Sequence, residues 1–190
     1  MSGTSLNAIL FLISAVFDLY IFVLIIRLIL AWSGAEYSHP ITQLVVQLTS
    51  FIIKPMKKIL PDIRGFETST LVLILVVEII KYFVITALSF GVPNILGLLL
   101  LAIGDSIKLV LELMFYAIFL QFIVGLIQPS SPIYQVLSKL TSPALRPFQR
   151  IIPTVGGFDL SPIPALIILQ LLIIIVVNPI LGMGLSIAVG

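Results

Sequence analysis

Four long apolar segments constrain the fold of this chain more than any other feature of its sequence. A helix needs about 20 mostly apolar residues to cross the hydrocarbon core of a bilayer. Residues 6–32, 69–90, 94–127 and 162–188 all reach that length. Of the whole chain 60% is hydrophobic and 9% is charged, against about 25% charged residues in a soluble domain. The sequence therefore predicts an all-α membrane protein with four transmembrane helices.

Two of these segments need a closer look. The first follows MSGTSLN, which has no basic region, so we expect a retained helix and not a cleaved signal peptide. The third is longer than one crossing requires. It fits a single tilted helix with its span at about 98–127, or a short re-entrant piece at 95–103 followed by a span. The repeat described next favours the single helix.

The chain contains an internal repeat. At a constant offset of 92 residues, HPITQ (39–43) matches SPIYQ (131–135), KPMKKILP (54–61) matches RPFQRIIP (146–153), and GFETS (65–69) matches GFDLS (157–161). An offset of 94 aligns Asp18 with Glu112 and Arg27 with Gln121. The pattern predicts two tandem units, residues 1–93 and 94–190. Each unit holds two spans, so both units should have the same orientation, as in a parallel repeat.

The basic residues predict the orientation. Seven of the ten Lys and Arg residues lie in the two connections inside the units. The N-terminus, the connection between the units and the C-terminus contain none. By the positive-inside rule, both basic connections should be cytoplasmic and both termini outside.

Each basic connection begins with an amphipathic pattern, with apolar residues at positions i, i+3, i+4 and i+7 from Ile41 and again from Ile133. This pattern is typical of a short helix in the membrane interface. The basic residues that follow fit either ordinary positive-inside anchoring or a site for anionic lipid or a partner protein. These candidates are Lys54, Lys57, Lys58, Arg146 and Arg150.

Prolines and small polar residues predict turns and helix caps in the same connections. Proline lacks an amide donor and blocks helix continuation, so rigid turns are expected at Pro55, Pro61, Pro147 and Pro153. Gly157 gives the backbone extra freedom. Asp159 or Ser161 should cap the last helix, with Pro162 as its first residue, and Ser69 with Thr68 or Thr70 should do the same in the first unit. An anion site formed by backbone amides is the alternative.

Several charged residues lie inside the predicted spans. Each costs roughly 2.5–3.5 kcal/mol on insertion scales, so such residues are functional candidates by default. Glu78 and Lys81 can pair at i, i+3, and the repeat brings Asp18 and Glu112 to similar depth. We regard these four as candidates for an ion path that binds a cation or shares a proton. Alternatively, they pair to hold the helices together, or they face a partner helix. Asp105 is placed near the outer interface.

No sequence pattern points to enzymatic chemistry. The chain has one histidine and no cysteine, and it lacks a P-loop, a GxGxxG motif and a nucleophile elbow. We therefore expect no cofactor, no metal site and no catalytic residues.

The runs LTSPALRPFQRIIP (140–153) and GGFDLSP (156–162), together with Asp18, Arg27 and Trp32, resemble the YggT family of small bacterial membrane proteins. The resemblance covers nearly the whole chain. It implies a multi-pass protein of the bacterial inner membrane that supports osmotic or salt tolerance through ion homeostasis, with potassium as one candidate ion. Related proteins imply an alternative, a scaffold in cell division or membrane-complex biogenesis. The expected partners are anionic lipids, further copies or other membrane proteins, and monovalent cations, but not nucleic acid directly.

Overall fold

The protein is all-helical in a computed structural model, which describes residues 3–32, 40–62, 67–152 and 159–190. Three long apolar helices are α1 (Gly3–Trp32), α3 (Thr68–Ser89) and α4 (Ile95–Ile127). A fourth is built from α6 (Pro162–Leu172), η1 (Ile173–Val177) and α7 (Asn178–Val189). All four are long and apolar enough to cross a membrane. The predicted four-span, all-α chain is confirmed at this level.

The third span is one continuous helix. It begins where the side chain of Asn94 accepts a hydrogen bond from the backbone N–H of Leu96, at 2.9 Å. This cap satisfies one of the amide groups that a helix start leaves unpaired. The helix then runs without a break to Ile127, so residues 95–103 are part of the span and do not form a re-entrant piece.

The fourth span contains a π-helical turn just before a proline. Pro179 has no N–H to donate, and its ring crowds the carbonyl four residues earlier. The wider turn of η1 lies over these residues, and π-turns of this kind occur as single insertions in α-helices. The chain therefore passes the proline without leaving the helical path.

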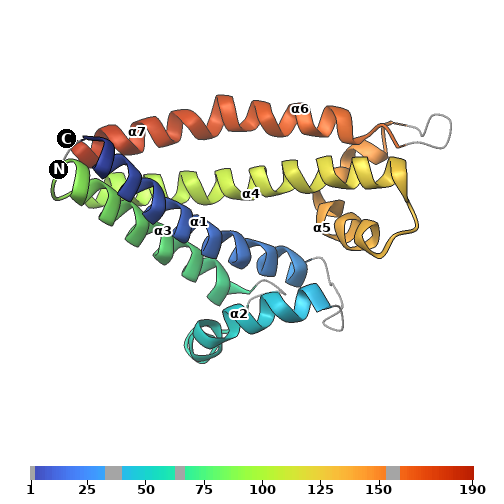
Figure 1. Ribbon diagram of the computed structural model, residues 1–190, viewed down its shortest axis with the longest axis horizontal. Coiled ribbons are helices and arrows are strands. Elements are labelled where there is room, and N and C mark those ends of the chain that lie inside the picture. The colour runs from blue at the N-terminus through green and yellow to red at the C-terminus, as the bar shows by residue number, and fades with distance from the viewer. Residues whose placement is uncertain (1–2, 33–39, 63–66, 153–158) are drawn as a thin grey trace.

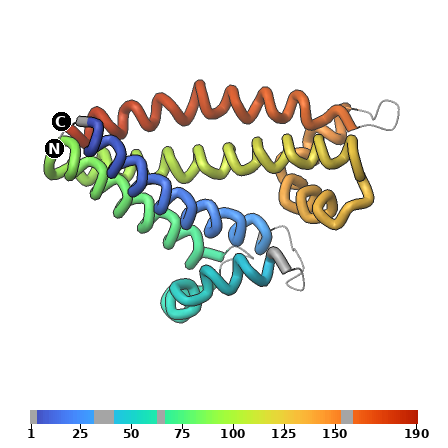
Figure 2. Tube along the Cα trace, in the orientation of Figure 1, coloured from blue at the N-terminus to red at the C-terminus, as the bar shows by residue number. Residues whose placement is uncertain are grey.

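The two ends of the molecule differ (Figure 1). Both termini and the turn between α3 and α4 lie at one end, where the backbone N–H of Asn94 donates to the carbonyl of Ala188 at 3.0 Å. Two further helices, α2 (Pro40–Lys57) and α5 (Pro132–Gln149), lie at the other end. The α1–α3 pair and the α4–α6 pair diverge toward that end, as the tube trace also shows (Figure 2).

The helix α4 is the centre of the packing, because it contacts α3, α5, α6 and α7. Its closest approach is to α7: a Cβ built on Gly97 would lie 2.2 Å from the backbone nitrogen of Ala188. A single apolar core continues from α1 through α3 and α4 into α6, with Ile21, Leu24, Leu73, Leu113, Ile118 and Ala165 among its buried members.

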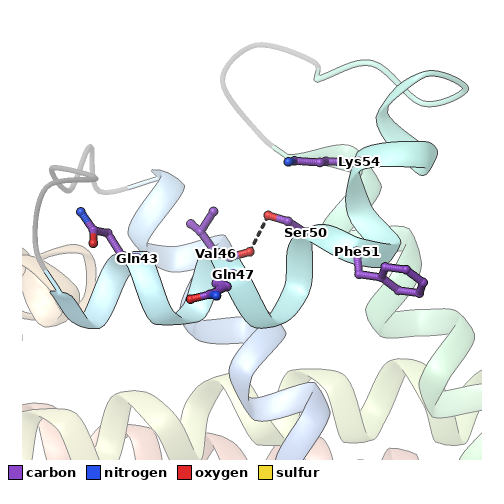
Figure 3. A pocket seen from close by; sticks show the side chains of 6 residues that line it. All are labelled: Gln43, Val46, Gln47, Ser50, Phe51 and Lys54. Atoms are coloured by element: carbon purple, nitrogen blue, oxygen red, sulfur yellow. Dashed lines mark hydrogen bonds between the residues drawn. The ribbon is translucent and has the colours of Figure 1, made fainter.

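The prediction that Pro55 and Pro147 stop their helices is wrong. Helix α2 continues through Pro55 to Lys57, and α5 continues through Pro147 to Gln149. Each proline lies in the last turn, where one missing donor removes only one helical bond and a bend can relieve the clash with the preceding turn. Figure 3 shows α2 bending between Ser50 and Lys54. Pro61 lies after the helix, and the predicted turn residues Pro153 and Gly157 lie outside the described residues.

Candidate functional site

One buried lysine collects carboxylates from three membrane helices. The ammonium nitrogen of Lys81, on α3, lies 2.8 Å from Asp18 Oδ1 on α1 and 2.7 Å from Glu78 Oε2 on α3 itself. It also makes a very short contact with the carboxylate of Asp105 on α4. We call these four residues the Lys81 cluster. The structure thus brings together three of the four ion-path candidates.

Helix geometry explains how the cluster forms. Glu78 and Lys81 are three residues apart, so they share the face of α3 that packs between α1 and α4. Glu78 is fully buried and Lys81 is 2% exposed. The side chain of Asp18 is 41% exposed, so Asp18 is the member of the cluster that is accessible from outside the protein. The ring of Tyr82 lies 4.9 Å from the lysine nitrogen and covers part of the charge.

The Lys81 cluster has more negative than positive groups, because three carboxylates share one ammonium. The two carboxylate oxygens of Glu78 are buried, and among the described residues neither accepts a hydrogen bond of normal geometry. A buried polar group without a hydrogen bond carries a desolvation cost. The arrangement can lower that cost by taking up a proton or a small cation. Within the described ranges, no three His, Cys, Asp or Glu side chains are placed to hold a metal ion.

The fourth ion-path candidate lies elsewhere. Glu112 forms an i, i+4 pair with Lys108, at 3.7 Å, and both side chains are about one-third exposed. Asp105, which the sequence places near the outer interface and not among the candidates, takes the place beside Lys81. Asp105 and Glu112 are seven residues apart, or two helical turns, and so share a face of α4. The repeat pointed to Glu112 as the acid of α4 in the ion path, whereas the packing of α3 on α4 places Asp105 beside Lys81.

A second polar site joins the end of α1 to α2 and to the start of α3. Arg27 Nε donates to Glu67 Oε2 at 2.8 Å, and Nη2 donates to Glu67 Oε1 at 3.2 Å. Its third nitrogen, Nη1, donates to the hydroxyl of Thr49 at 2.8 Å. Paired hydrogen bonds between a guanidinium and a carboxylate are strong and directional. They fasten α2 to the membrane helices.

Lys57 and Thr70 complete this site, which we call the Arg27 junction. Lys57 Nζ donates to Glu67 Oε1 at 2.7 Å and to Asp62 at 2.9 Å, and the Thr70 hydroxyl donates to Glu67 at 2.8 Å. Burial alone would raise the pKa of Glu67, but hydrogen bonds from Arg27, Lys57 and Thr70 outweigh it and lower this pKa to about 2. Lys57 is therefore paired with two carboxylates of the protein itself and is not a free anchor for lipid.

The sequence-matched positions of the second half form a version of this junction in which Asp159 is the charged member and glutamines replace Arg27 and Lys57. The hydroxyl of Thr141 contacts the side-chain amide of Gln121, and Gln149 Nε2 donates to Asp159 Oδ2 at 2.9 Å. The other carboxylate oxygen of Asp159 accepts the backbone N–H of Ser161 at 2.9 Å. Burial raises the pKa of Asp159, but the hydrogen bonds of Ser161 and Gln149 lower it further, so the net change is downward.

The predicted caps are only partly correct. Pro162 is the first residue of α6 and Ser161 is its N-cap residue, but the Ser161 side chain makes no capping hydrogen bond. Asp159 instead binds the backbone of Ser161 just before the helix. The prediction that Ser69 caps α3 is wrong: α3 begins at Thr68, and the Ser69 hydroxyl donates to the carbonyl of Leu60 at 2.7 Å.

The outer side of α2 carries an open groove (Figure 3). It has a volume of about 650 Å³ and is lined by Gln43, Val46, Gln47, Ser50, Phe51 and Lys54. Phe51 is 88% exposed. The remaining basic candidates Lys54, Lys58, Arg146 and Arg150 are also exposed. This part of the molecule combines apolar and basic groups that are available to lipid or to another protein.

Comparisons with known proteins found one matching family model and several relatives of similar length. The family model of CCB3/YggT matches residues 6–88 and again residues 100–180. An uncharacterised protein in the proC 3′ region of Vibrio alginolyticus is 33% identical over 87% of this chain and 91% of its own length. The uncharacterised protein YggT of Escherichia coli K12 is 31% identical over 88% of each chain. An uncharacterised protein of Pseudomonas aeruginosa is 29% identical over 93% of this chain and 92% of its own.

No solved structure matches this chain. The family match covers most of the sequence, in two successive segments that together cover most of each of the four apolar helices. The chain belongs to the CCB3/YggT family.

Proposed function

We propose that this protein acts without enzymatic chemistry in ion homeostasis, by taking up a proton or a small monovalent cation at the Lys81 cluster. The observation that carries the proposal is the excess of carboxylates around Lys81 inside the membrane spans. A purely structural ion pair between helices needs one acid for one base. Each further intramembrane charge costs roughly 2.5–3.5 kcal/mol on insertion scales, and this cost points to a functional role.

The three acids differ in exposure, and this difference supports a path for ion uptake from the exposed acid to the buried one. Asp18 is the exposed member, Asp105 is nearly buried, and Glu78 is fully buried. A cation attracted by Asp18 can be shared with Glu78 while Lys81 moves its hydrogen bonds among the three carboxylates. The family resemblance suggests the setting, which is tolerance of osmotic or salt stress with potassium or protons as the ions concerned.

The same proposal includes an arrangement in the membrane. The chain would form two tandem units of like orientation in the bacterial inner membrane, with α2 and α5 in the cytoplasmic interface and both termini outside. The match of the family model to two successive segments supports the tandem units. The exposed apolar residues Leu44, Leu48 and Ile133 support the interfacial position. Four spans enclose little space, so conduction would require a homo-oligomer.

Flux into proteoliposomes tests the function. In Asp18→Asn/Glu78→Gln, two carboxylates become neutral amides of the same shape, and Lys81 keeps Asp105 as its partner. We expect the wild-type protein to move protons or potassium. The flux through this variant should be at least ten-fold lower than that of wild type, while the variant stays folded. Glu112→Gln is the control, because Glu112 pairs with Lys108 outside the cluster, and its flux should equal that of wild type. Equal flux in all three proteins, or none above empty liposomes, would contradict the proposal.

A second candidate function is docking of anionic lipid or of a membrane-protein partner, as an assembly factor. It is favoured by the open groove on α2 and by the exposed basic residues Lys54, Lys58, Arg146 and Arg150. Replacing these four with glutamine should weaken binding to anionic vesicles and leave flux unchanged. Because Lys57 is held by Glu67 and Asp62, Lys57→Gln should destabilise the fold instead.

A further inference from the structure

The second half of the molecule has a cavity where the first half has an arginine side chain. The cavity measures about 50 Å³, and its lining includes the polar residues Gln121, Tyr134 and Asp159 and the apolar residues Phe122, Leu126 and Pro162. In the first half, Arg27 stands at the position of Gln121, and Glu67 stands at the position of Asp159. The guanidinium of Arg27 fills the space between α1 and Glu67. Gln121 is shorter, and the corresponding space beside Asp159 is open.

The hydrogen bonds of Thr141, which lies next to this space, indicate the orientation of the side-chain amide of Gln121. Thr49 donates its hydroxyl proton to the carbonyl of Val45 at 2.6 Å and accepts a hydrogen bond from Arg27. Thr141 occupies the matched position, and its hydroxyl contacts both the carbonyl of Leu137, at 2.9 Å, and the amide of Gln121. A hydroxyl has only one proton to give.

The matched network therefore assigns that proton to Leu137, as it is assigned to Val45 in the first half. The amide nitrogen of Gln121 then donates to Thr141, because the two ends of an amide have the same shape and are assigned from their partners. Its oxygen is left without that partner, on the side away from Thr141. Gln121 as a whole is only 4% exposed, so this oxygen has little access to bulk water.

The lining of the cavity is mainly apolar, and its acceptor groups are the amide of Gln121 and the carboxylate of Asp159. A carboxylate offers about four acceptor positions, and Asp159 accepts hydrogen bonds from the side chain of Gln149 and from the backbone of Ser161. The ring of Tyr134, which passes close to Gly125, forms one wall. A negative charge, an amide oxygen and an aromatic wall suit a cation. A single water needs only roughly 10–15 Å³, so the cavity has room for an ion.

We infer that this cavity, which we call the Gln121 cavity, binds a small monovalent cation between Gln121 and Asp159. The cation takes the place of the guanidinium that Arg27 supplies in the first half. It links α4 to the start of α6, as Arg27 links α1 to the start of α3. The site is separate from the Lys81 cluster and does not depend on the function proposed for that cluster.

Thermal unfolding of the purified full-length protein in detergent tests this inference, with the single tryptophan, Trp32, as one optical probe. The reference buffer contains N-methylglucamine chloride, and potassium, sodium or low guanidinium chloride replaces it at constant ionic strength. A ligand that binds the native state raises the unfolding midpoint as its concentration rises. We expect at least one of the three cations to raise the midpoint of wild type by several degrees.

Two variants and one control locate the effect. Gln121→Arg supplies its own cation, so its midpoint should be raised already in the reference buffer and should no longer respond to added cation. Asp159→Asn should lose the response, and so should Gln121→Met, which keeps the length and removes the oxygen. Glu112→Gln, a carboxylate change outside the cavity, should respond like wild type.

Other outcomes would overturn the inference. A wild type that responds to none of the three cations would mean that the cavity holds only water. An equal response in wild type, Gln121→Arg and Asp159→Asn would place the binding elsewhere. Asp18→Asn/Glu78→Gln should keep the response even where it abolishes flux, so this inference and the proposed function can fail independently.

Discussion

At the scale of single residues, matched positions in the two halves differ mainly in charge. Arg27, Lys57 and Glu67 form an ionic junction, whereas the matched Gln121, Gln149 and Asp159 make fewer charged contacts. The threonines at 49 and 141 keep their place in both. The first half therefore depends on buried charge to hold its loop helix, and the second half does not.

Glu67→Gln should destabilise the protein by about 3–5 kcal/mol at neutral pH, because removing one partner leaves the buried Arg27 without its counter-charge. The pKa of Glu67 is about 2 in the folded protein, below its ordinary 4.5. A carboxyl whose pKa is lowered by folding stabilises the fold above its unfolded pKa and loses this effect as pH falls. The midpoint of thermal unfolding should thus fall more steeply from pH 4.5 to 2 in wild type than in Glu67→Gln. Parallel curves for the two proteins would show that Glu67 is not ionised in the junction, and Glu112→Gln is the control for a lost carboxylate.

At the scale of helices, the tightest contact depends on residues without side chains. Gly97 and Gly184 lie where α4 meets α7, and a Cβ on Gly184 would come within 3.0 Å of the backbone of Leu101. Small residues let membrane helices approach closely, which strengthens packing where the hydrophobic effect is absent. Gly182, on the same helix, has nothing within 4 Å of its virtual Cβ.

Gly97→Ala should separate α4 from α7, because its methyl group would meet the backbone of Ala188 at 2.2 Å and no side-chain rotation relieves that contact. Overpacking costs typically about 1–3 kcal/mol, and we expect at least this loss in the unfolding free energy measured in detergent. Gly182→Ala adds the same methyl group in open space and should leave stability almost unchanged. Similar losses for both variants would contradict the close approach of the two helices.

The sequence predicted the positions of the helices better than the contacts between them. Apolar length alone located the four spans to within a few residues, since the bilayer fixes the length of a crossing helix. It failed at Pro55 and Pro147, because a proline in the last turn is tolerated. It also paired Asp18 with Glu112 by depth, whereas the packing of α3 against α4 brings Asp105 to Lys81. The spacing of residues along one helix does not determine which faces of different helices pack together.

At the scale of the whole molecule, the two ends have different chemistry. The termini and the turn at 90–94 lie at one end, and they carry no lysine or arginine. The helices α2 and α5, with their basic residues, both lie toward the other end (Figure 1). The positive-inside rule then applies to both connections in the same sense, and it predicts that α2 and α5 face the cytoplasm.

Cysteine labelling can test this orientation directly, because the chain has no cysteine of its own. Val92, Ile59 and Ile151 are all strongly exposed, the first at the end of the termini and the other two just after α2 and α5. In sealed vesicles with the outer face exposed, a membrane-impermeant maleimide should label Val92→Cys at once. Ile59→Cys and Ile151→Cys should react only after the membrane is opened. Labelling of Ile59→Cys and Ile151→Cys from opposite sides would mean that the two halves are inverted. That result would contradict both the parallel arrangement and the placing of α2 and α5 at the same end of the molecule.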